Sequence, residues 1–564
     1  MSFVDVLLGF VPLVVVGTFA LLFVRLLQRA RETDDTDSST MVRQIAFYGL
    51  LFLTMVLTAT GVTWVFGELV DRSRDFDNTQ LAQALALIAV GLPVFSVLLR
   101  IADHRLRADP NERSGVVWSM YLNIALLTTL TAAMVGTYRV LRGMLESSPG
   151  RSVEGSDVAM MTVWGALWLT HWFVMLRRHG VRGDSHLAIG SVVGIVVLGV
   201  GNVGLFYVGL DRLYGSVTND PLVERAGPTT SEWAALFAVG AMAWFWYWLS
   251  HFESSRRSEA WYITVVPVGA LLGFTAAVTS AAALLYLVAV YWIGEPDETE
   301  AVRHFDSAPF LSAVLITGLC SAGYHRWLLG AEPERNEPVR AYDYLLSAAA
   351  LVTWVVGGVF ALSGLTAGPI DRNEVLAGVT MLAVGLPLWR HFWTRTTQYA
   401  ANDPAEMSSQ IRTTSFAITL GLVGLTLLVS GIIALQGILE ALLDGRLDVE
   451  AVRDQRYSLA TLAMTALAAV PTVRAFRGQR TAQQVAPPRS HWPQRVIIVG
   501  GGDPVDLDEL QHPGVTLEYW HRTDRCRIPL GDIEDLSNQL EHQGGNDVLV
   551  VLDEGGPMVI PFTR

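Results

Sequence analysis

Hydrophobic residues in this chain gather in long apolar stretches that recur in pairs. Each stretch holds roughly twenty residues, and the pair of stretches repeats about every 72 residues along the chain. The six pairs start near Arg43, Gly115, Leu187, Trp261, Arg340 and Arg412. A fixed period of this size is typical of duplicated structural units, so the pattern predicts six tandem copies of one helix pair.

The apolar stretches have the length and composition of membrane-spanning helices. Ile263–Val290 and Ala417–Leu439 contain no Asp, Glu, Arg or His, and about 20 apolar helical residues cross the hydrocarbon core of a bilayer. A solitary stretch, Val6–Val24, precedes the pairs. We expect an anchor helix there rather than a removed signal peptide, because Met1–Asp5 is not basic and no small-residue cleavage site follows. The fold predicted is an all-α polytopic membrane protein with about thirteen transmembrane helices.

Composition agrees with this prediction and narrows the chemistry. The 564 residues are 51% hydrophobic, and the mean hydropathy is +0.38. The two cysteines, Cys320 and Cys526, fall in a predicted span and in the C-terminal tail, which excludes a disulfide framework. The sequence contains no catalytic motif that we recognise, and we expect neither enzyme activity nor a bound cofactor.

The arginines predict the orientation in the membrane. Loops that join one pair to the next carry about twice as many arginines as loops inside the pairs. Because positively charged loops stay in the cytoplasm, we expect the N-terminus outside and the C-terminus inside the cytoplasmic (inner) membrane. An odd number of spans fits that orientation.

The chain changes character after the last pair. We divide it into an N-terminal anchor and loop (1–41), six two-helix repeats (42–476), a linker rich in Arg, Gln and Pro (477–494) and a small α/β or α+β domain (495–564). The domain's helix is expected at Leu530–His542, with apolar residues at helical spacing. Its four strands are expected at Arg495–Val499, Val515–Trp520, Asp547–Leu552 and Met558–Phe562.

The C-terminal domain is acidic. From Val496 on it has thirteen acidic residues and four arginines, so nucleic acid is not an expected partner. A glycine run, Gly500–Gly502, follows the first strand, but VGGGDPVD fits neither the G-x-G-x-x-G nor the P-loop pattern. Asp503, Asp506 and Asp508 would repel a phosphate, so we interpret the run as a turn and keep a nucleotide or metal site as the alternative. A cytoplasmic or membrane protein is the expected partner of this tail.

The second stretch of most pairs ends in a common pattern of a small residue or proline, then aromatic residues. The pattern is complete in the fifth pair, over Gly385–Trp393 (GLPLWRHFW). Looser copies are Gly91–Phe95, Trp168–Trp172, Trp244–Trp248 and Gly318–Trp327. Small residues permit close helix contact, and tryptophans at i, i+4 share one helix face. The predicted membrane-interface anchors are Trp168, Trp172, Trp244, Trp248, Trp389 and Trp393.

This pattern, followed by a basic loop and a tyrosine-bearing helix, resembles the repeat of an uncharacterised bacterial membrane family, a domain of unknown function. The family pattern is close to G-L-P-x-W-x-x-H-W. The resemblance covers about Arg43–Arg480 and excludes the acidic tail. It implies a polytopic bacterial membrane protein and implies no activity.

Four polar residues inside the predicted spans are candidates for function, because ionisable and polar groups are rare there. His171, His325 and His391 could bind haem iron or another metal, although a histidine among Trp and Arg more often serves as a hydrogen-bonding anchor. Asn202 lies mid-span and would suit a transport path. Since no Asp or Glu lies deep in a span, the leading hypothesis is a non-enzymatic scaffold or sensor-like protein whose tail binds a partner. A transporter or channel is the alternative, and a haem or metal redox subunit is the more remote one.

Overall fold

A computed structural model describes most of the chain outside the N-terminus, several loops and parts of the C-terminal tail. The described residues are 35–71, 78–113, 115–146, 153–176, 185–218, 230–252, 259–330, 337–403, 406–407, 409–445, 448–485, 493, 495–500, 515–521, 536, 539–540, 547–553 and 556–562. Contacts divide the chain into two compact bodies, Met1–Val470 and Pro471–Arg564. The predicted anchor helix Val6–Val24 lies outside the described residues.

Helices make up almost all of the first body. The longer helices are α2 (Asp35–Val70), α3 (Asn78–Ala108), α5 (Val116–Leu145), α6 (Gly155–Thr170), α8 (Ser185–Thr218), α9 (Thr230–Trp244), α10 (Glu259–Pro267), α11 (Thr275–Ile293), α13 (Ala308–Gly330), α14 (Glu337–Thr366), α15 (Arg372–Asn402), α17 (Gln410–Leu443) and α19 (Arg456–Val485). Three short helices lie in the connections: α4 (Pro110–Arg113), α12 (Ala301–His304) and α18 (Val449–Asp454). Twelve helical segments of the described chain are long and apolar enough to cross a membrane. These segments correspond to the six predicted pairs.

Three segments are π-helical, where the sequence predicted uninterrupted α-helix. They are η1 (His171–Leu176), which continues α6, η2 (Phe245–Phe252), which continues α9, and η3 (Val268–Phe274), which joins α10 to α11. A π-helix adds a residue to each turn. η2 begins directly after Trp244, yet Trp244 and Trp248 both contact Tyr324, as residues on one helix face do.

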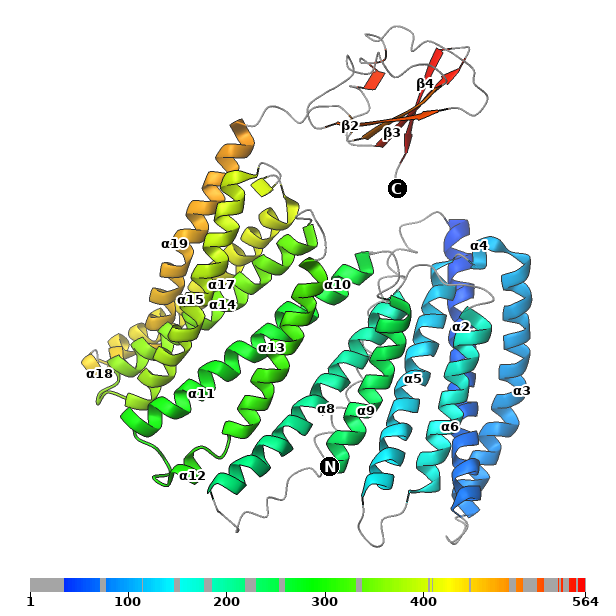
Figure 1. Ribbon diagram of the computed structural model, residues 1–564, viewed down its shortest axis with the longest axis horizontal. Coiled ribbons are helices and arrows are strands. Elements are labelled where there is room, and N and C mark those ends of the chain that lie inside the picture. The colour runs from blue at the N-terminus through cyan, green and yellow to red at the C-terminus, as the bar shows by residue number, and fades with distance from the viewer. Residues whose placement is uncertain are drawn as a thin grey trace. The chain divides into compact units, whose positions relative to one another are not determined.

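Packing groups the six helix pairs into three units of four spans. Unit A contains α2, α3, α5 and α6, unit B contains α8, α9, α10–α11 and α13, and unit C contains α14, α15, α17 and α19. In each unit the first helix packs against the second and the fourth. The third helix of one unit packs against the second helix of the next, α5 on α9 and α11 on α15. Within this body the units follow one another in a row, from the blue helices of unit A to the yellow helices of unit C (Figure 1).

Glycines allow the paired helices to approach closely. A methyl group at Gly385 of the GLP motif would come within 2.7 Å of the Trp354 backbone nitrogen on α14. One at Gly91, in the first GLP motif, would come within 2.7 Å of Thr58 Oγ1 on α2. Both glycines therefore lie where the second helix touches the first helix of its unit, which is the role expected of small residues between membrane helices.

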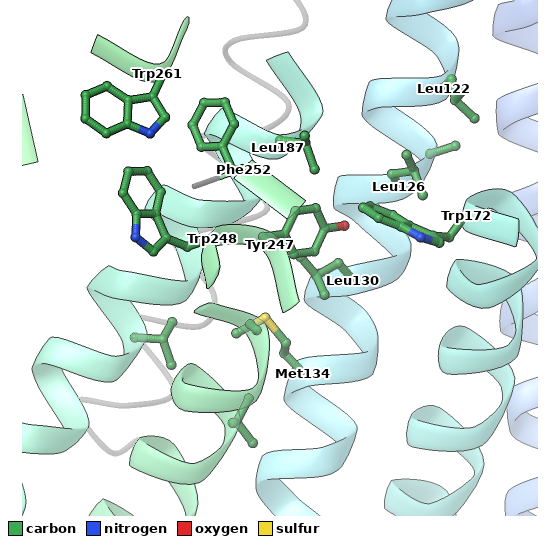
Figure 2. Packing of buried hydrophobic residues seen from close by; sticks show 14 of the residues in the cluster. Leu122, Leu126, Leu130, Met134, Trp172, Leu187, Tyr247, Trp248, Phe252 and Trp261 are labelled. Carbon is green, nitrogen blue, oxygen red and sulfur yellow. The ribbon is translucent and has the colours of Figure 1, made fainter. Parts of the chain in front are cut away.

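The main hydrophobic core runs from unit A into unit B and the first helix of unit C. Leu122, Leu126 and Met134 of α5 are buried in it together with Tyr247 and Trp261 of unit B. Figure 2 shows these side chains between the helices of the two units. Because one core crosses the unit boundaries, the units are not separate domains.

The C-terminal body contains a four-stranded sheet in the order β2-β1-β3-β4. β1 pairs in parallel with β2 and β3, and β4 returns antiparallel to β3. Leu536 and Leu540, the described part of the predicted helix, pack on one face of the sheet with Val496 and Val548. The strands are β1 (Arg495–Gly500), β2 (Thr516–His521), β3 (Asp547–Asp553) and β4 (Gly556–Phe562).

The boundary of this body differs from the expected one. Helix α19 runs to Val485, so the first part of the expected linker 477–494 is helical. The glycine run begins at Gly500, the last residue of β1. The rest of the run, and Asp503, Asp506 and Asp508 after it, lie outside the described residues.

Candidate functional site

An aromatic cluster joins unit A to unit B. We define it as Trp168 and Trp172 from the fourth span of unit A with Trp246, Tyr247 and His251 from η2. Neighbouring ring centroids lie 5.0–5.8 Å apart for the contacts of Trp172 with Trp168, Trp246, Tyr247 and His251. The Tyr247 hydroxyl points toward the Trp172 side of the core (Figure 2).

A hydrogen bond fixes this cluster. The indole nitrogen of Trp168 donates to the Tyr247 hydroxyl at 2.8 Å. A second bond of the same kind lies within unit B, where Trp248 donates to the Tyr324 hydroxyl at 2.7 Å, with the Trp244 ring 5.8 Å from the Tyr324 ring. Tyrosines thus link the tryptophans of one helix to another helix, a partnership that the tryptophan pattern alone did not predict.

The six predicted anchors have different environments. Trp172 and Trp248 are 3% and 2% exposed and belong to the protein core. The other four are half-buried, and Trp389 stacks on Trp393 at 5.6 Å in α15. Whether any of them lies at a lipid headgroup stays a prediction.

His171 has a hydrogen-bond partner at each ring nitrogen. Its Nδ1 lies 2.8 Å from the Leu167 carbonyl oxygen and its Nε2 lies 3.2 Å from the Tyr121 hydroxyl. The side chain is 2% exposed. A ring held at both nitrogens is positioned as a structural link between α5 and η1 and has no nitrogen directed at a ligand.

The other two histidines lie in different surroundings. His325 is buried on α13, with Nδ1 2.7 Å from the Ser321 carbonyl oxygen, and it packs against Gly269 of η3. His391 is exposed on α15. Among the described residues, no hydrogen bond or ring contact joins any two of the three histidines, and no group of three or more His, Cys, Asp or Glu has a geometry suited to a metal ion.

Asn202 forms a contact between helices. Its side-chain amide on α8 donates to the Thr317 hydroxyl on α13 at 3.1 Å. The bond joins the first and fourth helices of unit B. Asn202 is therefore an interhelical hydrogen-bonding residue in this structure.

The most polar buried group of the described chain was missed by the sequence reasoning. This ionic cluster consists of Glu337, Arg340, Tyr344, Glu406 and Arg412. Arg340 contacts Glu406 and Glu337, each at 2.8 Å, and Asp403 at 3.6 Å. Glu406 also accepts a hydrogen bond from the Tyr344 hydroxyl at 3.0 Å, and Arg412 donates to the same hydroxyl at 2.7 Å.

The cluster ties the loop between α15 and α17 to the start of α14. Glu406 is 0% exposed and Arg412 is 3% exposed. Burying a carboxylate and a guanidinium costs several kcal/mol each unless they pair and their hydrogen bonds are satisfied. Arg340 and the Tyr344 hydroxyl bond to Glu406, and Arg412 bonds to Tyr344, while the buried Nε of Arg412 has no hydrogen-bond partner. Most of the charged groups are therefore paired, and the loop is held mainly by charge.

Unit A repeats part of this arrangement. Tyr48 on α2 donates to Glu112 of the short α4 at 3.1 Å. Glu112 and Glu406 occupy the same place in two copies of an Asp-Pro-x-Glu-x-Ser sequence, residues 109–114 and 403–408. That local repeat is the signal from which the sequence could have predicted the paired glutamates.

A pocket of mixed polar and apolar lining lies between α2, α3 and α6. Its volume is about 340 Å³. Its lining combines the polar Thr63, Glu68, Asp71, Gln80 and Gln83 with the apolar Trp64, Leu81 and Ala84. Asp71 accepts a hydrogen bond at 2.8 Å from the Gly155 amide at the start of α6. The pocket lies at the helix ends that the loops inside the first and second pairs connect. The ionic cluster lies in unit C, more than 170 residues later in the sequence.

Comparison with known proteins agrees with the repeat found by packing. The profile of a domain of unknown function, DUF5671, matches residues 45–165, 185–319 and 340–470. Each match reaches into four spans and begins in the first helix of unit A, B or C. The third match ends inside α19, so it covers the first span of the sixth pair and part of the second. No curated protein and no solved structure matches the chain. The three matches cover more than half of the chain, which therefore belongs to the DUF5671 family.

Proposed function

We propose that this protein is a multi-pass protein of the cytoplasmic membrane that acts as a non-enzymatic scaffold, with its acidic C-terminal body in the cytoplasm for a protein partner. The observation that carries this proposal is the continuous core that joins the three four-helix units. Hydrogen-bonded aromatic pairs fix neighbouring helices in that core, and the sequence's mid-span polar residue, Asn202, bonds to Thr317. A closely packed helical body of this kind is suited to serve as a rigid support in the membrane for the C-terminal body and its partner.

The positions of charged groups support the orientation. Arg340 and Arg412 lie near the ends of spans at which one helix pair leads to the next. The loops between pairs are rich in arginine, which favours the cytoplasm as the side on which these loops lie. Reporter fusions test the topology. An alkaline phosphatase fused after Arg564 should be inactive and a green fluorescent protein at the same place should fluoresce. The reverse pattern would place the C-terminal body outside.

A cysteine-accessibility experiment separates the scaffold from a transport path. In a background of Cys320→Ser and Cys526→Ser, Asn202→Cys should resist a membrane-impermeant thiol reagent in intact cells. Glu298→Cys, in the exposed loop after α11, is the control that should react from outside. Rapid labelling of Asn202→Cys would overturn the scaffold proposal and favour a channel or transporter.

One observation favours transport as the second candidate. The pocket of about 340 Å³ places Glu68, Asp71 and Gln80 beside Thr63 of a span, and polar groups facing a cavity in a membrane protein often line a substrate path. If Thr63→Cys reacts with the impermeant reagent and Asn202→Cys does not, the pocket is a vestibule that ends short of mid-span. Reaction at both positions would support a continuous path.

A further inference from the structure

The row of units leaves two helices without the neighbour that their counterparts have. The third helices of units A and B, α5 and α11, are covered by α9 and α15 of the following unit. Among the described residues, no four-span unit follows α17 and none precedes α3. In the most apolar window of each span, 61% of residues are buried in α5 and 28% in the span that contains α11, against 11% in both α17 and α3.

The difference appears at matching positions. Counted from the Asp-Pro pairs at Asp109 and Asp403, Met134 of α5 corresponds to Leu428 of α17. Met134 is 6% exposed and Leu428 is 61% exposed. Likewise Tyr138 is 1% exposed and its counterpart Ile432 is 56% exposed. Figure 2 shows Met134 on the side of α5 where Tyr247 of unit B lies, and α17 has no such neighbour among the described residues. α17 also packs less closely on α19 than α5 packs on α6, and both differences expose it.

The α5–α9 and α11–α15 contacts each end in a polar interaction. It lies at the helix ends that the loops inside each pair connect. Arg142 near the end of α5 pairs with Glu232 at the start of α9 at 2.7 Å. Asn373 at the start of α15 exchanges hydrogen bonds of 2.9 Å and 2.7 Å with the backbone of Glu295, after α11. In both contacts, a polar group at or just after the end of the third helix meets the first turn of the second helix of the next unit.

The open faces carry matching groups for such a closure. Gln436 of α17 occupies the place of Arg142, and Glu440 and Asp444 follow it at the acidic end of this helix. α3 starts at Asn78, and Thr79 in its first turn occupies the place of Asn373. The positive end of the α3 dipole is complementary to the acidic end of α17.

We propose that α17 of one copy packs on α3 of a second copy, so that unit C of one chain is followed by unit A of the next. The contact continues the interface that joins α5 to α9 and α11 to α15. It uses two different surfaces, so copies associate head to tail into a ring or a row. The inference rests on the proposed membrane insertion. Lipid and the predicted anchor helix Val6–Val24, which lies outside the described residues, are the occupants that compete for these faces.

Disulfide cross-linking tests this contact in native membranes. In the Cys320→Ser, Cys526→Ser background, one chain carries Gln436→Cys on α17 and Ala82→Cys on α3. Ala82 occupies the place of Leu376, the α15 residue beside Gly294 at the α11 contact. Mild oxidation should give dimers and higher multiples. Each single variant should stay monomeric.

A matched control distinguishes contact from collision. Val288 of α11 is 48% exposed and lies outside the proposed interface, so Val288→Cys combined with Ala82→Cys should not cross-link. Equal cross-linking of both pairs, or none with Gln436→Cys, would overturn the proposal and leave lipid on these faces. Recovery of the chain in the membrane fraction shows that such a failure concerns the contact and not the insertion.

A packing variant gives a second readout. Leu428→Trp with Ile432→Trp should lower the cross-linked fraction of the Gln436→Cys, Ala82→Cys chain about tenfold, the change that 1.4 kcal/mol produces in an association constant. Val288→Trp should leave that fraction unchanged. An unchanged fraction in the α17 variant would contradict the proposed register.

Discussion

Units A and C hold matching loops, each through a tyrosine–glutamate hydrogen bond, and surround them differently. In both, a tyrosine of the first helix donates to the glutamate of an Asp-Pro-x-Glu-x-Ser loop, Tyr48 to Glu112 and Tyr344 to Glu406. Trp118 and Arg412 occupy the same place after these loops. Trp118 stacks on Tyr121 at 5.5 Å, and Arg412 bonds to Tyr344 and lies 4.8 Å from the Phe416 ring centre.

The comparison shows that one position of the repeat tolerates two kinds of stabilisation. An indole gains free energy by burying apolar area and by ring packing. A buried guanidinium is tolerated only when carboxylates and hydroxyls surround it, and Arg412 shares such a cluster with Arg340 and Glu406. Unit C therefore depends on charge at a place where unit A depends on packing.

The largest effect is expected from neutralising the charged loop. Glu406→Gln removes the buried carboxylate of Arg340 and leaves the more exposed Glu337 as its close partner. Because breaking a buried ion pair costs about 3–5 kcal/mol, the free energy of unfolding should fall by an amount near the lower end of that range. Glu112→Gln, at the matching place in unit A, removes one hydrogen bond to a charged group and should cost about 1.5–3 kcal/mol at most. Denaturant unfolding in lipid nanodiscs measures both. Equal losses of unfolding free energy in the two variants would show that unit C does not depend on charge at this loop more than unit A does.

The GLP glycines give the next effect. Gly385→Ala would press a methyl group onto the α14 backbone, and overpacking of this kind costs about 1–3 kcal/mol. Gly91→Ala meets the Thr58 hydroxyl instead, which can rotate, so its cost should be smaller.

Gly424 of α17 is the control for these variants. An added methyl there meets open space, and Gly424→Ala should stabilise the helix by up to about 1 kcal/mol. Thermal melting of the three variants checks the order. A Gly385→Ala protein as stable as Gly424→Ala would exclude the close helix contact.

The aromatic link between units A and B should have a smaller effect. Tyr247→Phe removes the acceptor of the Trp168 indole and should destabilise the protein by about 1 kcal/mol, with a shift in tryptophan emission. Tyr207→Phe is the control, because the Tyr207 ring packs on Phe310 and that contact persists. The same change in both variants would argue against the Trp168 bond.

The smallest effect belongs to the polar pair in unit B. Asn202→Ala and Thr317→Val, alone and combined, form a double-mutant cycle, and hydrogen bonds between membrane helices average about 0.6 kcal/mol in such cycles. A coupling energy of zero would show that this hydrogen bond does not stabilise unit B.

Several predictions from the sequence agree with the structure. The apolar stretches predicted the twelve described spans of the six pairs, and the alternating residues of the tail predicted its four strands within one or two residues. The GLP motif predicted close helix contact, which Gly91 and Gly385 confirm. These features are local, because hydropathy, strand alternation and the size of a side chain are read from neighbouring residues.

The sequence by itself determined the twelve apolar helices of the described chain, approximately where the pairs begin and that they repeat. The tertiary structure decided that the pairs join in fours, that Trp172 and Trp248 lie inside the core, and that Glu406 meets Arg340. The physical reason is that spans such as α5 and α17 are apolar on every side, so hydrophobic periodicity does not distinguish a face against another helix from a face against lipid. Which face is buried depends on which helices are neighbours, and that is decided only when the whole chain has packed.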